Sequence, residues 1–168
     1  MFNSAHLLRL PRIEQRPKKV IKSTNYRKLT DLPDIENISQ EKAQILAASL
    51  KEISHSIMNG YGLDEKYYRS NIDNSNYPDK LLEYAGIMHI HPLGPGTSEV
   101  LYMIQGTKSV GLLELTDHRH FDRINSPHCE ELIAIHGEFI KSHLETYNSN
   151  VFSYYGNIIY NNDNPKKA

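Results

Sequence analysis

The period of the hydrophobic residues changes twice along the chain, and this change limits the possible folds more than any other feature of the sequence. The first pattern is helical, with four aliphatic residues spaced by four, three and four positions: Leu46, Leu50, Ile53 and Ile57. Ser39 is typical of an N-cap, and Gly60 stands where a helix commonly ends in a left-handed residue. The pattern predicts an amphipathic helix over residues 39–59.

The second pattern has the period of two that is typical of β-strands. Ile87, His89 and His91 then share one face of a first strand. A loop rich in Pro and Gly follows, and two further strands are predicted on either side of a four-residue turn, at Glu99–Gln105 and Val110–Thr116.

A helical pattern returns after the strands. Pro127 is acceptable in the first turn of a helix, and we expect this second helix over about residues 127–146. Val151–Tyr160 is a candidate last strand. The order predicts an α+β domain in which helices cover one face of a small antiparallel sheet of at least three strands. The His residues are expected on the open face of that sheet.

Charge and composition divide the chain into three regions. Residues 1–28 hold eight of the 19 Lys and Arg residues but only one of the 20 Asp and Glu residues. We therefore expect a flexible basic arm over residues 1–36, a folded domain over 37–160 and a disordered tail over 161–168. The arm has two readings, because its cations are suited either to RNA phosphates or to the acidic body of the same chain.

Composition also excludes several classes of protein. No stretch approaches the roughly 18 apolar residues that a membrane helix needs. Cys129 is the single cysteine, so an internal disulfide and a cysteine-based zinc motif are both excluded. The expected location is the cytoplasm, without a membrane partner.

Two histidines on one strand face are the first candidate site. The side chains of His89 and His91 are expected about 7 Å apart. Imidazoles exchange protons near neutral pH, as general acid–base catalysis requires, and a pair on a strand is also a candidate for zinc. Two half-exposed polar residues without chemistry give the same pattern.

A second cluster leaves the end of the last predicted strand of the hairpin. Residues 117–123 read Asp-His-Arg-His-Phe-Asp-Arg, and Asn125 and His128 follow. Cleavage of RNA by its own 2′-hydroxyl needs a base, an acid and a cation for the phosphorane, and His and Arg supply all three without a metal or another cofactor. A charged turn that caps the second helix is the alternative reading.

The order of these motifs resembles the YafO-type toxins of bacterial toxin–antitoxin pairs. Residues 85–93, Ala-Gly-Ile-Met-His-Ile-His-Pro-Leu, resemble the segment before the central hairpin of that family, with its His-Ile-His-Leu core. Residues 99–102 and 110–115 are similar to the two hairpin strands. His120, Arg123, Asn125 and His128 resemble its pattern of a His, a nearby Arg, and an Asn three residues before another His.

The resemblance implies a RelE-like fold and a metal-independent endoribonuclease that cleaves messenger RNA on the ribosome and stops growth. A partner antitoxin would neutralise it. The expected catalytic residues, gathered on one open face, are His89, His91, Tyr102, His120, Arg123 and His128. Lys108 and Arg119 are the expected contacts to the RNA backbone.

Two other classes of protein remain open on the sequence. A cupin-like metal enzyme would use His89, His91 and Glu99, and the six residues between Glu99 and Gly106 fit its pattern, whereas the seven between His91 and Glu99 do not. A non-catalytic module that binds RNA or protein is the third class.

Overall fold

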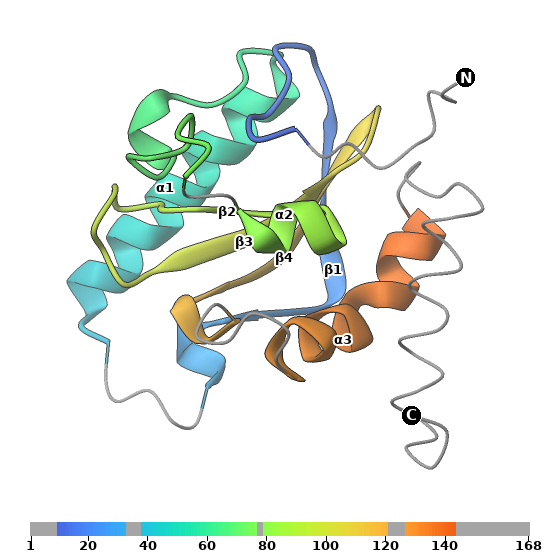
Figure 1. The fold of residues 1–168 in the computed structure, drawn as a ribbon. Helices are drawn as coiled ribbons and strands as arrows, with labels where there is room; N and C mark the ends of the chain where they lie inside the picture. Colours follow the sequence, from blue (N-terminus) through green and yellow to red (C-terminus); the bar gives the residue numbers. More distant parts are fainter. Residues whose placement is uncertain (1–9, 33–37, 77–78, 121–126, 144–168) are drawn as a thin grey trace, which may run out of the picture.

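The computed structural model describes residues 10–32, 38–76, 79–120 and 127–143. A four-stranded mixed sheet and three α-helices make up this part of the chain, so the predicted α+β class is confirmed (Figure 1). The strands are β1 (Lys19–Lys28), β2 (Ile87–Ile90), β3 (Val100–Gln105) and β4 (Ser109–Thr116). The helices are α1 (Gln40–Met58), α2 (Lys80–Ala85) and α3 (Pro127–His143). Short 3-10 turns η1 (Leu29–Asp31), η2 (Glu65–Tyr67) and η3 (His118–His120) connect them.

Helix α1 forms where the spacing of aliphatic residues predicts it. The hydroxyl of Ser39 accepts a hydrogen bond from the backbone N–H of Lys42 at 3.1 Å and caps the first turn. Gly60 follows the last turn with a φ of 81°. Ile53 and Ile57 are completely buried against the sheet, which stabilises the fold by about 1.5–3 kcal/mol for each side chain.

The first strand lies where the sequence predicts a flexible arm, and this corrects the expectation for residues 19–28. β1 pairs with β4 in parallel, and the strand order is β1-β4-β3-β2. The predicted antiparallel arrangement holds for β2, β3 and β4. The sheet is therefore mixed, because the pairing of β1 with β4 is parallel. This pairing joins segments about 90 residues apart in the sequence.

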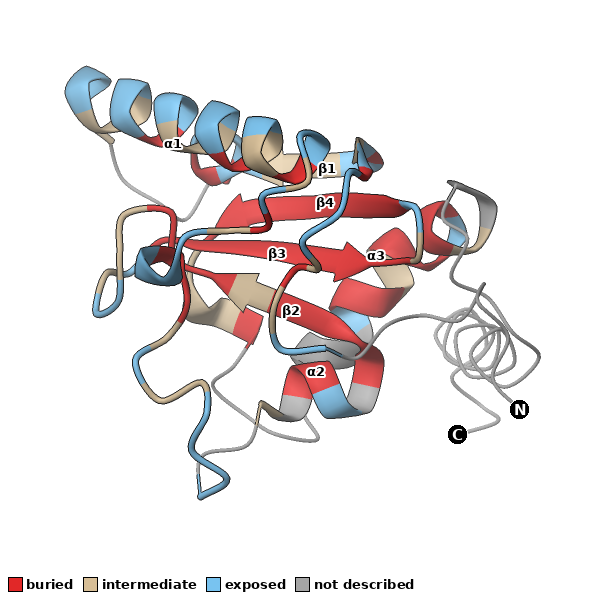
Figure 2. Ribbon diagram, turned by 90° about the horizontal axis from the view of Figure 1, so that it is seen from above, coloured by how far each residue is buried: buried red, intermediate tan, exposed pale blue. Residues whose placement is uncertain are grey.

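Both faces of β2, β3 and β4 are covered, so the predicted open face does not exist on these strands. Figure 2 shows β3 and β4 buried, with α1 on one side and α2 and α3 on the other. Against α1 the sheet presents Met88, Ile90, Leu101, Met103 and Leu112. On the opposite face its core residues are Ile87, Val100, Tyr102, Ile104 and Leu113. Histidines on that second face are consequently covered by helices and turns.

No helix in the described ranges has the length and apolar character needed to cross a bilayer. The candidate last strand at Val151–Tyr160 and the tail over 161–168 lie outside the described residues, as does the end of the second predicted helix beyond His143.

Candidate functional site

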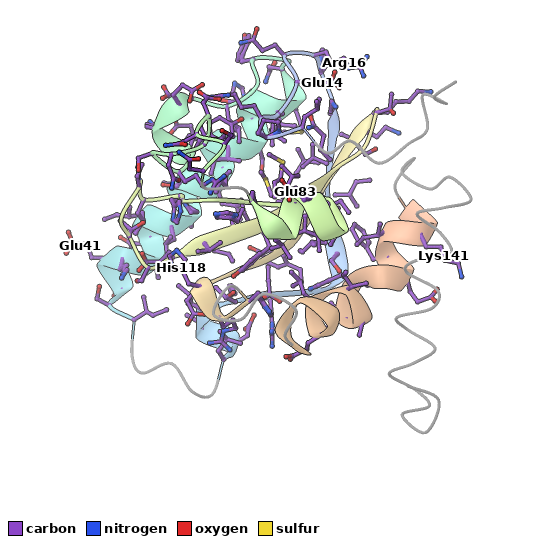
Figure 3. The ribbon with its side chains drawn as sticks, in the orientation of Figure 1. Glu14, Arg16, Glu41, Glu83, His118 and Lys141 are labelled. Atoms are coloured by element: carbon purple, nitrogen blue, oxygen red, sulfur yellow. The ribbon has the colours of Figure 1, made fainter. Side chains whose placement is uncertain are left out.

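At one end of the sheet, β2 and β4 finish beside the start of β3, and this arrangement brings distant polar residues together. β2 and β4 are both antiparallel to β3, so the ends of β2 and β4 lie beside the beginning of β3. His91 directly follows β2, Glu99 precedes β3, and His118 opens η3 shortly after β4. Figure 3 labels His118 on this turn. We call His89, His91 and His118 the histidine cluster.

The ring of His91 is in contact with both other rings of the histidine cluster. The ring centroids of His89 and His91 are 5.8 Å apart at an interplanar angle of 87°, and those of His91 and His118 are 5.3 Å apart at 33°. The strand period correctly predicts that His89 and His91 lie together. His118 belongs to the predicted cluster at residues 117–123 but is not among the expected catalytic residues, because a strand pattern cannot show where a turn two strands later will lie.

His91 is the buried centre of the cluster. Its backbone N–H donates to the carbonyl oxygen of Tyr67 at 2.8 Å, which fixes the chain as it leaves β2. Its ring atom Nδ1 is buried and has no hydrogen-bond partner among the described residues. Burial, and then the neighbouring His89 and His118, lower the pKa of His91. A neutral imidazole that can accept a proton is therefore favoured at neutral pH.

His89 is held by a carboxylate from the preceding helix. Its Nδ1 lies 3.2 Å from Oδ2 of Asp79. Asp79 also caps α2, because its Oδ1 accepts from the backbone N–H of Leu82 at 3.1 Å. Burial opposes ionisation of Asp79, but the interactions with His89, the backbone N–H of Leu82 and the charge of Arg69 together outweigh it, so the pKa of the carboxyl is lowered. An N-cap residue before a short helix is the signal that could have found this pair.

A lysine and a glutamate form an ion pair at the same end of the sheet. Glu99 is buried at the start of β3, and its carboxylate pairs with the ammonium of Lys42 in the first turn of α1. Burial alone would raise the pKa of Glu99, but the hydrogen bond and charge of Lys42, together with hydrogen bonds from its own backbone and from Ser98, outweigh burial and lower it. Arg119 follows His118, and its Nε donates to Asp117 at 2.8 Å with 22% of its side chain exposed.

Two residues predicted on an open face are buried beneath the site. The phenol of Tyr102 donates to the backbone oxygen of Asp117 at 2.6 Å, and burial raises its pKa. His120 stacks edge-on against Tyr102, with ring centroids 4.9 Å apart, and its Nε2 lies 2.6 Å from Oε1 of Glu114. Both side chains are buried and hydrogen-bonded to other groups of the core, an arrangement suited to supporting the site from beneath.

Other predicted residues lie apart from the cluster or outside the description. Lys108 is exposed on the turn before β4, at the opposite end of that strand from η3, so the structure does not place it beside Arg119. Arg123 falls in the range 121–126, outside the described residues. His128 is in the first turn of α3, and its side chain is likewise outside the description.

The described side chains include no group of three or more His, Cys, Asp or Glu residues arranged to hold a metal ion. Glu99, a proposed ligand in the cupin-like reading, is instead paired with Lys42. The described sheet is open and four-stranded. These observations lend no support to the cupin-like alternative.

Comparisons with known proteins add no family to this picture. No protein-family model, no curated protein and no solved structure matches the chain.

Proposed function

We propose that the chain is a cytoplasmic, metal-independent endoribonuclease whose catalytic groups are in the histidine cluster. The observation that carries this proposal is the 5.3 Å contact between His91, whose pKa is lowered, and His118, which is only half-buried. One neutral and one more exposed imidazole at this separation are suited to be the base and the acid of a single reaction.

In the proposed reaction the 2′-hydroxyl of RNA attacks the adjacent phosphorus. His91 takes the proton from the hydroxyl as the bond between O2′ and phosphorus forms. The bond from phosphorus to the 5′-oxygen breaks, and His118 gives that oxygen a proton. The products carry a 2′,3′-cyclic phosphate and a 5′-hydroxyl. Arg119 is the nearest described guanidinium along the chain to His118 and would stabilise the charge of the phosphorane.

Asp79 and His89 support this assignment from behind His91. A carboxylate that fixes the orientation of one imidazole also stabilises positive charge that develops nearby. Because His89 contacts His91 edge-on, we propose that His89 and Asp79 orient the base and do not themselves contact the 2′-hydroxyl. This refines the expectation that His89 is itself an acid or a base.

We further propose a RelE-like fold, action on messenger RNA and neutralisation by an antitoxin protein, as the YafO-type resemblance implies. Residues 87–90 and 110–115 of the resembling segments form β2 and most of β4 at the proposed site, which supports this reading. Expression in a bacterial host should stop growth, and His91→Gln should relieve the arrest. Continued growth at full expression of the folded protein would contradict the toxin proposal.

The decisive experiment is RNA cleavage by the purified chain in excess chelator. We expect cleavage to persist, to give cyclic or 3′-phosphate ends, and to stop where deoxyribose replaces the ribose at the cut site. His91→Gln and His118→Gln should each lower the rate by about 10²–10⁴. His55→Gln is the matched control, because His55 is an exposed histidine on α1 away from the cluster.

A metal-dependent enzyme would behave differently in the same assay. Loss of activity together with stoichiometric zinc would overturn the proposed mechanism, since the ion would then activate water or substrate directly. Binding of RNA with no cleavage under any condition would favour the non-catalytic module.

A further inference from the structure

A buried carboxylate lies beneath the histidine cluster and binds groups from three separate elements. Glu114 of β4 has no exposed surface. Its two oxygens contact Nε2 of His120 at 2.6 Å and Nε of Arg27 at 2.9 Å, and they accept from the hydroxyl of Thr116 at 3.0 Å. His136 of α3 lies 3.5 Å away through its Nε2.

This carboxylate stands where the regular sheet is interrupted on both sides. Tyr102 pairs with Glu114 but Met103 pairs with Leu112, so the register of β3 and β4 shifts at this point. The register of β1 and β4 also shifts just before Arg27 pairs with Glu114. Bulges of this kind re-aim a side chain out of the regular pattern and commonly occur beside functional sites.

Burial alone would raise the pKa of Glu114, but hydrogen bonds from His120 and His136 and the charge of His120 outweigh it, so the pKa lies well below its usual range. The carboxyl is therefore ionised at neutral pH. An ionised group with partners on β1, η3 and α3 restrains all three, since moving any one of them would leave a buried charge with fewer hydrogen bonds.

The turn η3 is held at both ends by buried groups. Before it, the backbone oxygen of Asp117 accepts from the hydroxyl of Tyr102 at 2.6 Å. At its end, His120 is bound to Glu114 at 2.6 Å. His118, between these two anchors, contacts His91. A turn of three residues that is fixed at both ends has little freedom to move its central side chains.

We propose that Glu114 is a positioning residue, which holds η3 so that His118 faces His91 without itself touching the RNA. Tyr102 acts in the same way from the other end of the turn. This inference rests on the proposed nuclease function and gives Tyr102 and His120 a role that their burial allows.

Glu114→Gln is the main test, because glutamine keeps the shape of the side chain and removes its charge. We expect the variant to fold, with kcat lowered roughly 10- to 100-fold, since a displacement of about 1 Å can cost that much in rate. KM should stay within about threefold. Glu83→Gln is the matched control, because Glu83 is an exposed glutamate on α2, labelled in Figure 3, and should change nothing.

A second measurement does not depend on activity. In NMR spectra of protein with labelled histidines, the ring protons of His91 and His118 should give a mutual nuclear Overhauser effect in the wild-type chain. Glu114→Gln should weaken or abolish this effect while the spectrum stays that of a folded protein. If Glu114→Gln does not fold, Tyr102→Phe tests the same inference at the other anchor with the loss of a single hydroxyl.

The outcomes separate this inference from the proposed function. A folded Glu114→Gln or Tyr102→Phe protein with unchanged kcat and an unchanged contact between the two rings would overturn the positioning role, even if the wild type cleaves RNA. A wild-type chain that cleaves no RNA, either alone or with ribosomes, would refute the proposed function. In that case loss of the ring contact in Glu114→Gln would still support the positioning of η3.

Discussion

The contact between Gly60 and Pro17 tests whether the N-terminal segment is docked on the domain. Gly60 has a φ of 81°, and a Cβ added there would lie 2.7 Å from Cδ and 2.9 Å from the backbone nitrogen of Pro17. The next residue, Lys18, donates its backbone N–H to the carbonyl of Ile57 at 3.2 Å. Alanine at Gly60 must therefore displace the chain where it enters β1.

The expected loss in the free energy of unfolding has two parts. The left-handed conformation of a non-glycine residue costs about 1–2 kcal/mol, and overpacking against Pro17 adds about 1–3 kcal/mol. Gly96→Ala is the matched control, because Gly96 has a φ of 84° and no atom within 4 Å of an added Cβ. Gly96→Ala should therefore lose only the first part.

Urea unfolding followed by circular dichroism measures the difference between the two variants. We expect Gly60→Ala to be less stable than Gly96→Ala by about 1–3 kcal/mol, and Pro17→Ala to relieve part of this loss in the double variant. Equal losses within about 0.5 kcal/mol would refute the reasoning. They would mean that the segment before β1 moves away freely, as a flexible arm would.

Three further predictions concern the site and its support. Glu114→Gln should lower the free energy of unfolding at pH 7 by about 3–5 kcal/mol. Because the folded-state pKa of Glu114 is lowered, the stabilisation by its charge is present above the unfolded pKa and is lost as the pH falls. A difference in stability between wild type and variant that does not narrow below about pH 4.5 would contradict this prediction. Because the pKa of His91 is lowered, kcat/KM should rise with pH to a midpoint below about 6.5, and an acid limb centred above pH 7 would exclude His91 as the base. Asp79→Asn should keep α2 capped but lower the cleavage rate by tenfold or more, whereas a rate equal to wild type would show that His89 needs no carboxylate.

Periodicity predicted the parts of the fold that depend on nearby residues. The aliphatic stripe of α1 and the alternation in β2 each lie within one element, so their spacing alone determines which side chains share a face. The placement of His89 and His91 on one side of β2 followed from the same rule. The structure brings their rings to 5.8 Å.

The parts that could not be predicted depend on long-range contacts. β1 carries exposed or half-buried residues at every position but Ser23, so its sequence has no alternation to detect. It becomes a strand because it pairs with β4, about 90 residues later. Long-range contacts also determine why His120 is buried and His118 is only half-buried, since His120 binds Glu114 in the core. A lone glutamate within an aliphatic strand was the available signal.

The ion pairs of the N-terminal segment bear on the two readings of its charge. Arg12 bridges Glu65 and Asp73 with contacts of 2.7 Å to each. Lys18 is completely buried on Glu14, and Arg27 is bound to Glu114. Arg16 also pairs with Glu14. Arg12 and Arg27 thus pair with carboxylates of the acidic body, as the docking reading expects, whereas Lys18 and Arg16 pair with Glu14 of the segment itself.

If the segment binds RNA, the exposed cations of β1 are therefore the residues expected to contact phosphates, and their number determines the expected salt dependence of binding. Lys19, Lys22 and Lys28 are exposed, and the ammonium of Lys22 lies 5.0 Å from the ring of Tyr26 without a carboxylate partner among the described residues. If each meets one phosphate of a single strand, replacing all three by Gln should reduce the slope of log K against log salt by about 2, since each contact contributes about 0.7. If all eight basic residues of 1–28 met phosphates, the wild-type slope itself would have a magnitude of about 5 to 6. An unchanged slope in the triple variant would show that RNA does not bind along β1.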